Sequence, residues 1–161
     1  MAYFDMKPIN EDEMAAMEEQ LQHEQREVTK AILITLEEKY KKDGTIENIF
    51  EYAAYLIRSP IRNDKLKGID LLSKLKSNSK VAEEAHFFLV KGLWWDANYV
   101  DANKEVDEFV GLYPQNRRGL ILKEMIYKKV EHDGYVGLAM AGVGVAALGA
   151  VAFGVAKALS R

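Results

Sequence analysis

Apolar residues along most of the chain recur at spacings of three and four positions, which is the period of an α-helix. Leu71, Leu72 and Leu75 form one such group, and Val106 and Phe109 belong to another. The strict alternation of apolar and polar residues that is typical of β-strands does not occur along the sequence. The pattern therefore predicts an all-α fold.

Short polar segments that contain Gly, Pro, Asn or Ser divide this pattern into separate helices. At the N-terminal end, Asn10 is the predicted helix cap, and Glu13 three positions later completes a capping-box pattern. Because the connections are short, we expect an antiparallel bundle of helical hairpins. The predicted helices are 45–58, 64–76, 81–95, 99–112 and 116–131, preceded by one or two between Glu11 and Lys42.

The hairpins show a repeat of 34 residues. A shift of the chain by this length aligns Tyr52 with His86 and Gly68 with Ala102. Thirty-four residues is the period of tetratricopeptide repeats, in which a small residue lets two helices approach and a proline closes the unit. Ala102 and Pro114 supply both parts in the second unit, and Gly68 supplies the small residue in the first. The bundle should therefore contain two tetratricopeptide-like repeats with flanking helices.

A stretch of 23 residues without a charge, 134–156, follows the predicted bundle. As a helix it would span roughly 34 Å, which is enough to cross a bilayer core. A buried core helix is the alternative, although such helices seldom stay free of charge for so long. We therefore predict an acidic N-terminal arm or extra helix (1–27), a cytosolic bundle (28–133), a transmembrane tail anchor in the lipid bilayer (134–156) and a short basic tail (157–161).

Small residues recur every four positions within the predicted anchor, at Gly142, Ala146, Ala150 and Gly154. A ridge of small residues lets membrane helices pack closely, so it indicates a homo-oligomer. The same spacing also arises by chance in a segment rich in Ala and Gly. Both interpretations stay open.

Charge and composition narrow the class of protein. The 161 residues contain 22 Lys and Arg against 25 Asp and Glu, a balance that argues against a nucleic-acid partner. The acids are concentrated at the start, where residues 1–44 hold 11 acids and 6 bases. The chain has no cysteine, which excludes disulfides, thiolate zinc sites and thiol nucleophiles.

Catalytic motifs are not apparent. The three histidines do not occur at the spacing of metal ligands, and no serine lies in a G-x-S-x-G motif. His86 lies among apolar residues, where a core or groove histidine with a satisfied hydrogen bond is the plain interpretation. We therefore predict no catalytic residue, no metal site and no cofactor. The protein is expected to act by binding and not as an enzyme.

A stack of helical hairpins offers a concave groove, lined by the first helix of each repeat, that can hold a partner helix or extended peptide. Trp94 and Trp95 point about 100° apart on a helix, so one can face the groove while the other packs in the core. The alternative is that both are packing residues. The predicted partner-binding groove consists of Ala53, Ile57, Phe87, Lys91, Trp94, Ile121 and Met125.

Six short segments follow one another along the chain: Phe50 to Ser59, Asn63 to Leu72, Gly92 to Trp94, Tyr99 to Ala102, Tyr113 to Asn116 and Asp133 to Gly137. Together and in this order they resemble the mitochondrial fission 1 protein family over roughly residues 36–161. The resemblance implies a six-helix bundle with two tetratricopeptide-like repeats and a tail anchor in the outer mitochondrial membrane, and often in the peroxisomal membrane. The segment before Val28 is longer and more acidic than the arm typical of the family.

The resemblance further implies recruitment of a dynamin-type division GTPase or its adaptor protein. The basic residues Lys157 and Arg161 behind the span should then carry much of the targeting information, although they are fewer than is common in the family. Two other classes stay open. One is a tail-anchored receptor for chaperones or targeting factors, and the other is a protein that forms pores or bends membranes through its Gly/Ala-rich span.

The N-terminal arm carries an apolar stripe, with Met14, Met17 and Leu21 at spacings of three and four. One interpretation is an extra core helix that extends the bundle. The other is a gate, in which Glu24 and Gln25 interrupt the stripe and residues 10–21 fold back onto the groove. The acids of the arm would then meet Lys91, and its methionines would cover Trp94, Ile121 and Met125.

Overall fold

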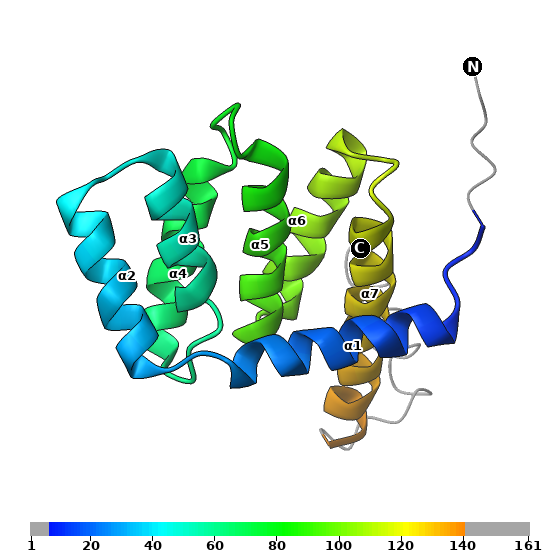
Figure 1. Cartoon of the computed structure of the whole chain (residues 1–161). Helices are drawn as coiled ribbons and strands as arrows, with labels where there is room; N and C mark the ends of the chain where they lie inside the picture. The colour runs from blue at the N-terminus through cyan, green and yellow to red at the C-terminus, as the bar shows by residue number, and fades with distance from the viewer. Residues whose placement is uncertain (1–6, 141–161) are drawn as a thin grey trace, which may run out of the picture. The chain divides into compact units, whose positions relative to one another are not determined.

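The computed structural model describes residues 7–140, which form seven α-helices and no strand (Figure 1). The all-α prediction is confirmed. The helices between residues 30 and 112 pack side by side as antiparallel neighbours, as expected from their short connections. The helices are α1 (Glu11–Arg26), α2 (Lys30–Lys42), α3 (Ile46–Leu56), α4 (Arg62–Leu75), α5 (Ala82–Trp95), α6 (Tyr99–Leu112) and α7 (Arg117–Met140).

Side-chain caps explain where several helices begin. The predicted capping box at α1 is confirmed, since the Asn10 side chain accepts a hydrogen bond from the Glu13 backbone and the Glu13 carboxylate accepts one from the Asn10 backbone. Thr29 and Thr45 cap α2 and α3 in the simpler way, each accepting from the backbone three residues later. Asn98 does the same for α6. These caps satisfy N–H groups that the first turn of a helix leaves without partners.

The two predicted repeats correspond to α3 with α4 and to α5 with α6. Gly68 of α4 faces the α3 backbone so closely that an added Cβ would lie 2.9 Å from the Ala53 carbonyl oxygen. Ala102 of α6 occupies the equivalent place in the second repeat and is fully buried. Gly119 of α7 lies against the ring of Phe109 in the same manner. Small residues thus allow close packing of successive helices, as a tetratricopeptide-like repeat requires.

Helix α7 does not end where the predicted bundle ends. The prediction was a helix over 116–131, whereas α7 continues through Asp133 and Gly134 to Met140. Residues up to Ile126 pack as one compact unit. No helix within residues 7–140 is both long and apolar enough to cross a membrane. Most of the predicted span 134–156 and the targeting residues Lys157 and Arg161 lie outside the described residues, so they stay predictions.

Candidate partner-binding groove

Helix α1 lies across α5 and the first turns of α7 and does not run alongside a neighbour in the stack (Figure 1). Three non-helical residues, 27–29, connect it to α2. The predicted interruption of the arm at Glu24 and Gln25 is wrong, because α1 continues without a break to Arg26. Both acids therefore belong to the helix that crosses the bundle.

One end of α1 is held by an ion pair with α5. The Lys91 ammonium donates a hydrogen bond of 2.5 Å to the Glu24 carboxylate, and a guanidinium nitrogen of Arg58 lies 3.6 Å from the same oxygen. Gln20, one turn earlier on α1, donates to the other oxygen of Glu24 at 2.9 Å. The carboxylate is thus fixed from both sides, by its own helix and by the bundle.

Aromatic rings surround the ammonium of Lys91, whose side chain is only 3% exposed. The ammonium nitrogen lies 4.4 Å from the centre of the Phe88 ring and 5.1 Å from that of Trp95. Burial lowers the pKa of Lys91 below its ordinary value, while the Glu24 carboxylate opposes this change. Burial would raise the pKa of Glu24, but the hydrogen bond and charge of Lys91 outweigh it and hold that pKa below its ordinary value. Each charge therefore depends on the other for its stability.

The other end of α1 is held by Arg117, the first residue of α7. Its guanidinium donates to both oxygens of the Glu13 carboxylate, at 3.0 and 2.8 Å. It also donates to the backbone carbonyls of Lys7 and Pro8, just before the helix. Two parallel donors match the fork of a carboxylate, which makes this contact specific in geometry as well as in charge.

The apolar stripe of α1 points into the bundle between these two ion pairs. Leu21 is 1% exposed and Met17 is 7% exposed, whereas Met14 is half-buried. Burial of two such side chains contributes about 3–6 kcal/mol to docking, before the entropic cost of ordering the arm is counted. The apolar contacts therefore supply affinity, and the two ion pairs at the ends fix the position of the helix along the groove.

The predicted groove residues do not all lie together. Lys91 lies under α1, where it pairs with Glu24. Phe87 lies beside Arg118, whose guanidinium carbon is 4.6 Å from the centre of the Phe87 ring. Ile121 and Met125 of α7 are buried. Ala53 and Ile57 are fully buried where α3 packs on α4 and α5, so the structure places them in the core of the stack.

The two neighbouring tryptophans also lie in different surroundings. Trp94 is half-buried and packs its ring against Tyr99 of α6, with the ring centres 5.3 Å apart. It is Trp95, one position later and one helical turn from Lys91, that lies beside the ammonium. Helical periodicity could have found this, because positions 87, 91 and 95 follow each other at spacings of four. The sequence analysis also missed Arg58 and Arg117, whose acidic partners are distant in the sequence.

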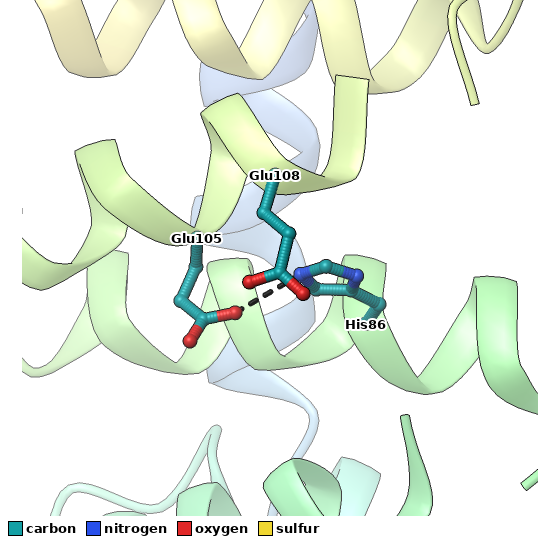
Figure 2. Close-up of side chains that lie close together, drawn as sticks. All are labelled: His86, Glu105 and Glu108. Atoms are coloured by element: carbon teal, nitrogen blue, oxygen red, sulfur yellow. Dashed lines mark hydrogen bonds and ion pairs between the residues drawn. The ribbon is translucent and has the colours of Figure 1, made fainter. Parts of the chain in front are cut away.

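A second cluster of charged groups lies between α5 and α6 (Figure 2). His86, Glu105 and Glu108 lie close enough to share a cation. The Lys76 ammonium already bonds to both carboxylates, at 2.8 Å to Glu105 and 3.3 Å to Glu108, and Nε2 of His86 lies 3.0 Å from Glu105. Burial lowers the pKa of Lys76, but its two carboxylate partners outweigh this and raise it overall. His86 is thus a satisfied core histidine, and the cluster connects three helices.

A shallow apolar hollow of about 310 Å³ lies between α2 and the α3–α4 connection, on other elements than the groove. Ile34 and Ile61, which line it, are 49% and 58% exposed. Three charged residues, Lys30, Glu37 and Asp64, also line it.

Comparisons with known proteins agree with this architecture. No family model matches the chain. The crystal structure of the fission protein Fis1 from Saccharomyces cerevisiae superimposes with a TM-score of 0.66 at 24% identity, over 73% of this chain and 95% of that one. Yeast Fis1 in complex with an Mdv1 fragment gives a TM-score of 0.62 at 25% identity, over 66% of this chain and 88% of that one. The bovine mitochondrial fission 1 protein is 32% identical over 139 residues, which cover 80% of this chain and 91% of the relative, so the chain belongs to the mitochondrial fission 1 protein family.

Proposed function

We propose that the chain is a tail-anchored adaptor on the outer mitochondrial membrane that recruits the division machinery and has no catalytic role. Its bundle faces the cytosol, residues 134–156 cross the bilayer, and the groove under α1 binds a dynamin-type GTPase or an adaptor for one. A second proposed function of the same kind is in peroxisomal fission. The proposal also includes self-association of the chain through the small residues of the span.

The single observation that carries the proposal is the occupied groove. A helix of the chain itself lies on the bundle through a buried apolar stripe and two ion pairs, which is how such a surface would hold a partner helix. The yeast relative, whose fold is the same, has been crystallised with a fragment of Mdv1 that contains an N-terminal extension and a coiled coil. A helical partner for the present chain follows by analogy with that complex.

Helix α1 would then act as the gate of the groove. A partner that needs the groove binds only while α1 is away, so its apparent affinity falls with the open fraction. An open fraction of one in a hundred weakens binding a hundredfold, or by about 2.7 kcal/mol. The buried contacts of Leu21 and Glu24 support a small open fraction, because both side chains must leave these contacts together when α1 moves away.

The test is a capture experiment with the full chain in detergent micelles. Wild type is compared with Leu21→Asp, which should release α1 because a carboxylate cannot occupy that buried position. We expect the released variant to retain more of a dynamin-type GTPase or its adaptor, identified by mass spectrometry. Lys91→Met in the same background should abolish the gain, whereas Trp94→Ala asks whether that half-buried ring contributes.

A matched control variant is Ile61→Asp, which alters the exposed apolar hollow beside α2 and leaves the groove intact. Its capture should equal that of wild type. If Ile61→Asp loses the partner while Lys91→Met keeps it, the hollow is the binding site and the groove proposal fails. If the proteins captured by the released variant are mainly chaperones, the alternative function as a receptor for chaperones is favoured.

Targeting is tested separately by microscopy of the full chain in cells. Replacing Lys157 and Arg161 with Glu should move the protein to the endoplasmic reticulum or leave it in the cytosol, because a weakly hydrophobic span gives the targeting machinery little else to recognise. An unchanged mitochondrial or peroxisomal location would show that these two residues are dispensable.

A further inference from the structure

We propose that the groove recognises partner helices by a four-point pattern that α1 itself displays, namely a carboxylate, two apolar side chains and a second carboxylate on one helical face. In α1 these are Glu13, Met17, Leu21 and Glu24, at successive spacings of four, four and three. Such spacings put all four on one side of a helix, over about 16 Å of its length. This inference rests on the proposed function and specifies the chemistry of the partner.

The cations of the groove make an acidic partner necessary. Lys91 is 3% exposed and Arg58 is 13% exposed, so both charges are largely removed from water. An apolar helix that displaced α1 would cover them without supplying a negative charge, and unpaired buried charges are strongly destabilising. The groove therefore rejects helices without a carboxylate at this end, which is specificity by exclusion.

The same end also explains how a partner can displace α1. Among the described residues, the buried Nε of Arg58 and the indole nitrogen of Trp95 have no hydrogen-bond acceptor while α1 is docked. Arg58 reaches Glu24 only at 3.6 Å, which is an ion pair without a close hydrogen bond. A partner with a carboxylate placed nearer to this guanidinium nitrogen would add a close hydrogen bond that Glu24 does not make, and would bind more tightly than α1 does.

The opposite end of the groove recognises the first carboxylate of the pattern through the geometry of its hydrogen bonds. Arg117 offers two parallel donors to Glu13, a geometry that an amide or a hydroxyl cannot match with full charge. Because this site is about one-third exposed, its contribution to affinity should be smaller than that of the buried end. The distance between the two basic sites then fixes the separation of the acids in the partner.

The test uses a library of helical peptides with the sequence of residues 8–27, in which the four pattern positions are randomised. The receptor is the full chain in micelles with Leu21→Asp, which keeps its own arm, and the arm of a second copy, out of the groove. We expect Asp or Glu at the first and fourth randomised positions and apolar residues at the second and third. Replacing the last acid with its amide should weaken a selected peptide about ten- to a hundredfold in fluorescence anisotropy.

Two receptor variants make the test specific to position. Lys91→Met should weaken the preference for an acid at the fourth position, where Arg58 remains, and leave the first position unchanged. Arg117→Met should weaken the preference at the first position and leave the fourth unchanged. Thermal melting of each variant checks that the bundle is folded, and Met17→Asp serves as a second released background. A library that yields apolar residues without acids, or variants that alter both positions equally, would overturn the pattern.

The result of the peptide-library test is independent of the proposed function in membrane division. If the library yields the pattern but the captured proteins contain no dynamin-type GTPase or adaptor, the recognition pattern holds and the proposed function fails. If such a partner is captured through Lys91 and the library shows no acidic preference, the function holds and the pattern is wrong.

Discussion

Replacement of Gly68 by Ala should destabilise the bundle although Ala favours helices. The added Cβ would lie 2.8 Å from Cγ2 of Ile57 and 2.9 Å from the carbonyl oxygen of Ala53. Carbon atoms in contact normally lie about 3.5–4.0 Å apart, so α3 and α4 must separate by several tenths of an ångström. Ile57 and Ala53 are fully buried and cannot turn away into solvent.

Two opposing effects set the magnitude. Ala is favoured over Gly in a helix by about 1 kcal/mol, while forcing an extra methyl group into a well-packed core costs about 1–3 kcal/mol. Gly111 of α6 provides a matched control, because an added Cβ there meets no atom within 4 Å. The helix preference acts in both variants, so the difference in their free energies of unfolding isolates the packing cost of about 1–3 kcal/mol.

The measurement is thermal unfolding of the full chain in micelles, followed by circular dichroism. Gly111→Ala should melt at or above the wild-type temperature, and Gly68→Ala should melt about 3–10 °C below Gly111→Ala. If Gly68→Ala is as stable as Gly111→Ala, α3 and α4 can accommodate the extra methyl group without a packing cost. The close approach of α3 and α4 would then not be a requirement of the repeat.

Three further perturbations test the arm and the charged cluster. The pKa of Glu24 in the folded protein lies below its ordinary value. The contribution of Glu24 to the docking of α1 is therefore fully present above the ordinary pKa and is lost as the pH falls through the lowered pKa. Tryptophan fluorescence should report a transition in this acidic range, and Glu24→Gln should lack it. Glu105→Gln should cost about 2–4 kcal/mol in a melting experiment, because it weakens the contacts of Glu105 with both His86 and Lys76. Glu108→Gln, whose side chain is 54% exposed, should cost less than about 1 kcal/mol. Equal losses would contradict the central place of Glu105, which Figure 2 shows bonded to His86. Asn10→Ala removes one half of the capping box and should weaken α1 by about 1 kcal/mol, measured as faster hydrogen exchange confined to α1.

The fold follows closely from local signals in the sequence. The helix-cap residue Asn10 and the small residue Gly68 act within one turn or one hairpin, so their roles can be deduced from spacing alone. The end of α7 is different, because no Gly or Pro stops the helix at the predicted bundle boundary; Gly134 is simply included in it. Helix ends without a capping or breaking residue depend on what the helix packs against.

The groove was only partly predictable, for a reason that Glu24 illustrates. When only its neighbours along the chain are considered, a charged residue such as Glu24 is interpreted as the end of the apolar stripe. Its partner Lys91 is 67 residues away, and this long-range contact makes the buried position of the acid favourable. The position of Trp95 beside Lys91 follows from their spacing of four, whereas the half-buried position of Trp94 depends on its packing against Tyr99 of α6.

The connection of only three residues between α1 and α2 has a kinetic consequence. A helix tied so closely to its own binding surface experiences an effective concentration in the millimolar range, whatever the amount of protein in the sample. Closing so short a loop takes well under a microsecond, so α1 returns to the bundle much faster than most free partners can arrive by diffusion. Dilution therefore cannot expose the surface beneath α1, and only a change in the helix, its tether or its ion pairs can do so.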